Sequence, residues 1–217
     1  MITREDRGGV AVITLANGEN LVDADFLTAV HAQLDAVESD DACTALVVTG
    51  AEKFFSNGFD LGYLGSLDLD GLQSFVGDAQ RLVARVLTLP LATVAAINGH
   101  AFGIAAMLAL AHDHRVMRSD RGWWCLPEVD LGLPLQPFMV ALLRARLSDA
   151  TVADAVLTGR RYDGHATVAA GISHAAVEGE RLLDRAVEIA AERGNKRRDI
   201  LGTLKRDLYA PVVAALD

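Results

Sequence analysis

The segment that most constrains the fold is ATVAAINGHAFGIAAMLALAHDHRVMRS, residues 92–119. A short apolar run typical of a strand is followed by a glycine turn, an apolar run typical of a helix, and a second strand-like run. A strand–helix–strand crossover joins parallel strands, and parallel sheets are covered by helices on their faces. We therefore predict an α/β fold for roughly the first 130 residues.

The segments before this unit fit the same fold. Residues 6–9 predict the turn of a hairpin whose second strand runs over residues 10–15. The apolar stripe from Phe26 to Val37 predicts an amphipathic helix with Asp23 as its N-cap. The run ALVVTGA, residues 45–51, then predicts a strand that is buried on both faces.

The remaining segments are mostly helical. A helix is predicted from Leu72 to Val86 and ends before Pro90. The part beyond residue 130 is also mostly helical, with one strand-like piece at residues 171–177. With 217 residues and 51% hydrophobic content, the chain can bury one sizeable core. We divide it into an α/β core that carries the ligand site, residues 1–145, and a helical C-terminal region, residues 146–217.

Charge and cysteine content narrow the function. The formal net charge is -9, which argues against binding to nucleic acid or to an anionic membrane, because such proteins present a basic face. The two cysteines form no CxxC or Cys/His pattern, so we expect neither a disulfide framework nor a metal site. The charged first ten residues do not resemble a signal peptide, and we expect a cytoplasmic protein.

Two glycine corners are candidates for a binding site. SNGFD, residues 56–60, and NGHAFGIAAM, residues 98–107, each follow a strand-like run, and ligands of α/β folds bind at strand ends. Each corner can turn backbone N–H groups outward, and the second also opens a helix. Two converging N–H groups would form an oxyanion hole, which stabilises an enolate or a tetrahedral oxyanion. Each corner taken alone is also compatible with a tight turn that binds nothing.

Four motifs in order resemble the crotonase superfamily, the enoyl-CoA hydratase and isomerase fold. They are FFSNGFDLGYL (54–64), AAINGHAFGIAAMLALAHDHRVM (95–117), LPEVDLGLP (126–134) and LTGRRYDGHATVAAGISHAAV (157–177). The resemblance covers roughly residues 5 to 180 and is closest to the Δ3,Δ2-enoyl-CoA isomerases of plant peroxisomes. It implies a superhelix of ββα turns, with a helical C-terminal region that takes part in oligomerisation.

The resemblance also implies the catalytic residues. The backbone N–H groups of Phe59 and Ile104 correspond to the family's oxyanion donors, and Glu128 corresponds to its acid/base glutamate. Most relatives have glycine where this chain has Ile104, so we expect a narrower pocket. Family hydratases use a second glutamate, whose position here is Met107. We expect further substrate contacts from the two corners, at Ser56, Asn57, Gly58, Asp60, Leu61 and Gly103.

Within the first corner, we expect two polar side chains to serve the loop itself. Asp60 is expected to accept backbone hydrogen bonds rather than act as a base. Ser56 has no nucleophile-elbow motif around it and is expected to be a turn hydroxyl.

A single carboxylate suffices to move a double bond, whereas hydration also requires an activated water. The first hypothesis is therefore an enoyl-CoA isomerase of fatty acid metabolism that acts on an acyl-CoA thioester, with Glu128 as the one base and coenzyme A as part of the substrate rather than a cofactor. A hydratase or acyl-CoA hydrolase, with Asp130 replacing the missing glutamate, is the second hypothesis. A non-catalytic acyl-CoA-binding protein is the third.

Other polar and aromatic residues receive secondary interpretations. We expect His100, His112 and His114 to act in capping and packing rather than in metal binding. Trp123 and Trp124 fit the acyl tunnel, the core or a subunit contact. By resemblance, Lys53, Lys196 and Lys205 are candidates for contacts to the CoA phosphates, and the assembly is expected to be a homotrimer or a dimer of trimers.

Overall fold

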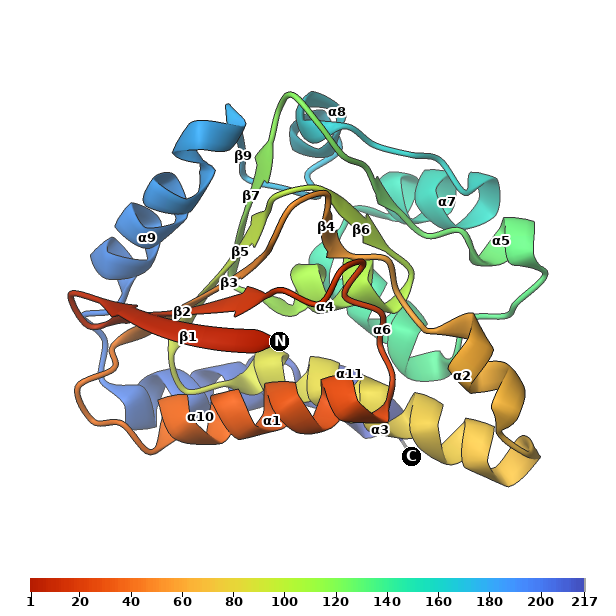
Figure 1. The fold of residues 1–217 in the computed structure, drawn as a ribbon, viewed down its shortest axis with the longest axis horizontal. Coiled ribbons are helices and arrows are strands. Elements are labelled where there is room, and N and C mark those ends of the chain that lie inside the picture. The colour runs from red at the N-terminus through yellow and green to blue at the C-terminus, as the bar shows by residue number, and fades with distance from the viewer. Residues whose placement is uncertain (217) are drawn as a thin grey trace.

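The structure, a computed structural model, describes residues 1–216, and its β-strands form two sheets (Figure 1). The larger sheet has the order β1-β2-β3-β5-β7-β9, and the smaller has the order β4-β6-β8. The strands are β1 (Ile2–Arg7), β2 (Val10–Leu15), β3 (Ala45–Gly50), β4 (Phe54–Ser56), β5 (Ala92–Ile97), β6 (His100–Phe102), β7 (His114–Arg118), β8 (Trp124–Cys125) and β9 (Ala175–Val177).

Helices cover the sheets and make up most of the second half of the chain. They are α1 (Ala24–Glu38), α2 (Leu61–Ser66), α3 (Leu69–Thr88), α4 (Ile104–Ala111), α5 (Glu128–Leu131), α6 (Pro137–Arg146), α7 (Asp149–Thr158), α8 (Gly164–Ala169), α9 (Leu182–Arg193), α10 (Arg198–Leu208) and α11 (Ala210–Val213), with short 3-10 turns at Gly179–Arg181 and Ala214–Leu216. Among residues 1–216, no helix combines the length and the apolar character that crossing a membrane requires.

The strand pairing confirms the two local predictions on which the fold rests. β1 and β2 form an antiparallel hairpin, and β2, β3, β5, β7 and β9 follow one another in parallel. The segment around residues 92–119 forms the expected crossover from β5 through α4 to β7. It also contains a short strand that the sequence pattern did not indicate, because β6 occupies the glycine turn and pairs with β4 and β8.

The larger sheet separates two layers of apolar side chains. Alternate residues of β2 face opposite sides, so Val10 and Val12 pack against α9, whereas Ala11 and Ile13 belong to the larger core with α1, α3 and α4. Figure 1 shows α9 on one side of this sheet and these three helices on the other. Every residue of α4 is buried, so the backbone groups at the two ends of this helix lie inside the protein.

Two arginines bond the carboxyl end of α4. Arg115 and Arg146 both donate to the carbonyl oxygens of Leu110 and His112, at distances between 2.7 and 3.2 Å. Positive charge is favourable here because the last carbonyl groups of a helix carry its negative dipole end. The Arg115 guanidinium donates to the carbonyl oxygens of Leu110, His112 and Ile172 rather than to a carboxylate. Burial lowers its pKa to about 9.

Candidate active site

The small sheet brings the two glycine corners together. β4 and β6 are parallel neighbours, with Phe54 opposite His100 and Ser56 opposite Ala101, so both chains leave the sheet at the same edge. The corners touch directly. At Gly58, where φ is +87°, a β-carbon would lie 2.8 Å from the carbonyl oxygen of Phe102. Glycine is therefore required at this position by both backbone conformation and space.

The first corner holds Phe59 with its amide free. The chain on either side is pinned to Val22, which donates to Gly58 O at 2.8 Å and accepts from Asp60 N at 3.1 Å. The N–H of Phe59 itself has no acceptor among residues 1–216. Its ring packs against Phe75 of α3, with centroids 5.8 Å apart. The backbone of Phe59 is thus fixed, while its N–H remains available as a donor.

The second corner ends at the start of α4. Gly103 adopts φ +53° and ψ -123°, and its N–H donates to Cys125 O at 3.0 Å. Ile104 is the first residue of the helix, so its N–H has no acceptor within the helix, and no side chain caps this end. Ile104 is buried, with 4% of its surface exposed. A β-branched side chain is accommodated because the glycine before it makes the turn.

Glu128 reaches this corner from a third segment of the chain. It begins α5, and a β-carbon built on Gly103 would lie 3.4 Å from Glu128 Oε1. Its other oxygen, Oε2, is buried and has no hydrogen-bond partner within the described part of the chain. Burial raises the pKa of Glu128 and outweighs the opposing effect of a backbone hydrogen bond.

Helix α4 supplies no carboxylate to accompany Glu128. Met107 is fully buried one turn into the helix, and the helix carries only apolar residues. Asp130 is exposed, and its side chain lies at the end of α7 instead. Its Oδ2 would be 2.5 Å from a β-carbon built on Gly159. Of Glu128 and Asp130, only Glu128 therefore lies against the second glycine corner.

The remaining residues of the first corner mostly shape the loop. The Ser56 hydroxyl donates to Asn20 O at 2.6 Å and accepts from Gly58 N at 3.2 Å, and Asn57 donates to Glu19 Oε2 at 2.6 Å. Asp60 caps α2 by accepting from Tyr63 N at 3.0 Å, which confirms that it fixes the loop. Leu61 begins α2 with an exposed side chain. Contact of these side chains with substrate stays a prediction.

Two buried asparagines that sequence reasoning missed hold the corners in place. The Asn20 amide donates to the carbonyl oxygens of Leu15, Phe54 and Phe55, and it does so from a left-handed backbone conformation with φ +52°. The Asn98 side chain accepts from Gly50 N at 2.9 Å and donates to Phe54 O at 3.3 Å. Their polar loop sequences signal turns, but nothing local indicates that their amides bind distant strands.

The prediction that Lys205 contacts the CoA phosphates is wrong. Lys205 is 5% exposed, and its ammonium group donates to Leu91 O at 2.7 Å and to Asp113 Oδ2 at 2.6 Å. An internal ion pair of this kind leaves no free charge for a ligand. Lys53 and Lys196 are exposed and remain candidates.

The histidines and tryptophans take structural positions. His100 packs among the rings of Phe54, Phe102 and Trp123, with centroids 5.0 to 5.3 Å apart. His112 is fully buried and bonds Leu108 O through Nδ1 at 2.9 Å. Trp124 belongs to the core and donates to Ala106 O at 3.1 Å. His114 stacks on a neighbouring ring, that of His174, with a centroid distance of 3.9 Å.

Comparison with known proteins decides what this arrangement belongs to. The family model described as enoyl-CoA hydratase/isomerase matches residues 5–217. The chain belongs to the enoyl-CoA hydratase/isomerase family. Among curated relatives of this family, enoyl-CoA delta isomerase 3 of Arabidopsis thaliana is 32% identical over 229 residues, which cover 100% of this chain and 95% of the relative.

Solved structures of family members share the fold. The probable enoyl-CoA hydratase EchA3 of Mycobacterium tuberculosis has a TM-score of 0.93 and 26% identity, covering 99% of this chain and 91% of that one. Human mitochondrial delta3-delta2-enoyl-CoA isomerase has a TM-score of 0.94 at 22% identity, covering 99% and 85%. The crotonase fold expected from the four motifs is confirmed, and the protein is an enzyme of this family with relatives that are isomerases.

Proposed function

We propose that the protein is an enoyl-CoA isomerase that moves the double bond of a 3-enoyl-CoA thioester from C3 to C2. The carboxylate of Glu128 removes a proton from C2, and the electron pair spreads over the thioester oxygen and the former double bond as a dienolate. The resulting carboxylic acid returns the proton to C4, which leaves the double bond between C2 and C3, in conjugation with the thioester. The base is regenerated, and no water or cofactor takes part.

The observation that carries this proposal is the contact between Glu128 and the second glycine corner. Glu128 Oε1 lies against Gly103, immediately before the helix whose first N–H belongs to Ile104. A thioester oxygen placed between the N–H groups of Phe59 and Ile104 would therefore have its C2 carbon near the carboxylate. The positive end of the α4 dipole would add to the stabilisation of the dienolate oxygen.

The environment of Glu128 suits a base that must also act as an acid. Burial raises its pKa, which brings the proton affinity of the carboxylate closer to that needed to take a proton from carbon and return it. Its unpartnered Oε2 leaves one oxygen free to face a substrate. A carboxylate already engaged in an ion pair would be a weaker base, because a neighbouring cation lowers the pKa.

Met107 and Asp130 favour an isomerase over a hydratase. Hydration requires a water that is positioned and activated, and the position from which family hydratases supply a second glutamate is filled by Met107. Asp130, the alternative second acid, lies against Gly159 instead. We therefore place the hydratase or hydrolase second, and a protein that binds acyl-CoA without turnover third.

The test is a spectrophotometric assay of 3-decenoyl-CoA that follows formation of the conjugated 2-enoyl thioester. Wild type is expected to form it, and Glu128→Gln is expected to lower kcat/KM by about a hundredfold or more, because the amide cannot accept the proton. Asp130→Asn is the matched control and is expected to retain wild-type kcat/KM. Water addition to a 2-enoyl-CoA without isomerisation, or equal losses in both variants, would contradict the proposal.

Assembly and location complete the proposal. By analogy with the superfamily, the protein would act as a homotrimer, or as a dimer of trimers, in the cytoplasm. Light scattering coupled to gel filtration measures the first property directly, and a monomer would contradict it.

A further inference from the structure

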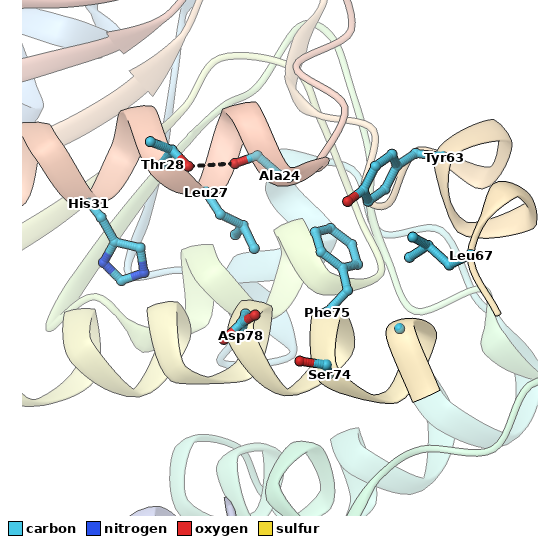
Figure 2. A pocket seen from close by; sticks show the side chains of 10 residues that line it. Ala24, Leu27, Thr28, His31, Tyr63, Leu67, Ser74, Phe75 and Asp78 are labelled. Atoms are coloured by element: carbon cyan, nitrogen blue, oxygen red, sulfur yellow. Dashed lines mark hydrogen bonds between the residues drawn. The ribbon is translucent and has the colours of Figure 1, made fainter. Parts of the chain in front are cut away.

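A cavity of about 440 Å³ lies between α1 and α3, close to the first glycine corner but outside it. Its size falls within the range of small-molecule pockets. Figure 2 shows Leu27 of α1 and Phe75 of α3 pointing toward each other across it, with Tyr63 of α2 at one end. Leu67, immediately after α2, adds a further apolar wall. The rest of the lining is more polar and includes His31 and Asp78.

Aromatic contacts connect this cavity to the catalytic corner. The ring of Phe59, whose amide is the proposed oxyanion donor, packs on Phe75 at 5.8 Å between centroids. Tyr63 meets Phe75 edge to face at 5.0 Å. Phe75 and Tyr63 both line the cavity. The rings of Phe59 and Phe75 therefore connect the first glycine corner to the cavity.

The opposite direction is closed to an acyl chain. On the α4 side of the corner, Ile104, Met107 and Leu108 are at most 4% exposed and belong to the main core. By contrast, α2 buries none of its residues, and Tyr63 and Leu67 are only partly buried where they pack against the core. An acyl chain that extends from the oxyanion corner would therefore find free volume toward α2 and α3, where the cavity lies.

The polar residues at the rim limit what the chain can carry. The His31 ring accepts at Nδ1 from Arg85 at 3.0 Å, and burial together with Arg85 lowers the pKa of His31, which disfavours its charged form. Figure 2 shows it extending from α1 toward α3. Asp78 contributes a carboxylate to the same rim and is paired with Arg81 at 2.6 Å. A negatively charged chain end would therefore meet a carboxylate and no unpaired cation among the residues that line the rim.

We propose that this cavity receives the distal part of the substrate's acyl chain, and that it selects uncharged chains of medium or greater length over short or ω-carboxylated ones. The inference rests on the proposed isomerase function. Phe59 and Phe75 would guide the chain past the aromatic layer, and Leu27 and Leu67 would bury its methylene groups. Short chains would end before Phe75 and would gain nothing from the cavity.

Ser74 offers a direct test, because it lines the cavity from α3 and its residue is solvent-exposed. Ser74→Trp should fill the cavity without disturbing the core. The measurement is the ratio of kcat/KM for 3-dodecenoyl-CoA to that for 3-hexenoyl-CoA. Ser74→Trp is expected to lower this ratio by about tenfold or more, as loss of a few buried methylene groups would. Gln73→Trp, an exposed neighbour outside the lining, is the matched control and should keep the wild-type ratio.

A substitution in the α1 wall of the cavity controls for an effect that is specific to α3. Thr28→Phe, from α1, is expected to lower the same ratio in the same direction. Thermal unfolding of each variant checks that it folds. Equal ratios in Ser74→Trp, Thr28→Phe, Gln73→Trp and wild type would overturn the cavity proposal while leaving the isomerase intact.

Charge is tested separately with an ω-carboxylated 3-dodecenoyl-CoA. Wild type should use it about tenfold less well than the uncharged chain, and Asp78→Asn should narrow the gap. Equal use of both chains by wild type would overturn the proposed selectivity. Should no 3-enoyl-CoA be isomerised at all, the proposed function fails. Calorimetric binding of dodecanoyl-CoA and hexanoyl-CoA to the same variants then decides the cavity proposal by itself.

Discussion

The two ends of helix α4 lie in the same core, yet they are treated in opposite ways. At the carboxyl end, Arg115 and Arg146 donate to the last carbonyl groups. At the amino end, the N–H of Ile104 has no side-chain cap, and the neighbouring Glu128 carries an oxygen without a partner. Buried polar groups left without partners cost free energy, so a folded protein keeps few of them.

The two ends show where this protein's stability and its chemistry are located. At the carboxyl end, Arg115 of β7 and Arg146 of α6 fix the helix, although the Nε2 atom of His112 is buried there without a partner among residues 1–216. The open end is destabilising by itself, and its unsatisfied N–H and carboxyl groups are the ones that a substrate would satisfy. Substitutions at the two ends should therefore separate stability from activity.

The largest effect on stability is expected near the carboxyl end of α4, from Lys205→Met. The change removes the buried partner of Asp113 and the donor to Leu91 O, and it should lower the free energy of unfolding by about 3 kcal/mol. Urea denaturation measures the loss, with kcat/KM of the folded protein expected to stay at the wild-type value. The exposed Lys196→Met is the control and should change little. A catalytic defect in Lys205→Met without loss of stability would contradict the separation of stability and activity between the two ends of α4.

An intermediate effect is expected at the open end, from Gly103→Ala. The positive φ of Gly103 strains any residue with a β-carbon, by about 1–3 kcal/mol. The added methyl group would also lie 3.4 Å from Glu128 Oε1, so kcat/KM should fall as well. Gly65→Ala in α2, where a β-carbon meets nothing within 4 Å, should be neutral or slightly stabilising. Unchanged activity in a stable Gly103→Ala protein would mean that this corner does not form the site.

The smallest effect concerns the stability contribution of Glu128 itself. Because burial raises the folded-state pKa of Glu128 above its ordinary value, the ionised carboxylate destabilises the folded protein, and this cost grows as pH rises through the folded-state pKa. Glu128→Gln should therefore have a higher Tm than wild type at pH 8, and the difference should shrink toward zero near pH 4. A variant with a lower Tm at pH 8 would show that the carboxylate is satisfied in the folded protein.

Several elements could be predicted from the sequence because their causes are local. The hairpin, the helix capped by Asp23 and the crossover through α4 follow from turn residues and from the period of apolar residues. The glycine corners were recognisable for the same reason, since a positive φ at Gly58 and Gly103 is a property of the turn itself. The four ordered motifs then indicated the family, which the comparisons confirm.

The sequence was therefore enough for the fold class and the two corners, and its resemblance to the family pointed to Glu128 as the candidate base. Three contacts depend on the tertiary structure: Glu128 approaches Gly103, Asp130 lies against Gly159, and the Asn20 amide donates to the distant carbonyl groups of Phe54 and Phe55. The tertiary structure also buried Lys205 and left a cavity beside Phe75. These features depend on residues far apart in the chain, and burial, pairing and free volume arise only when packing brings such residues into contact.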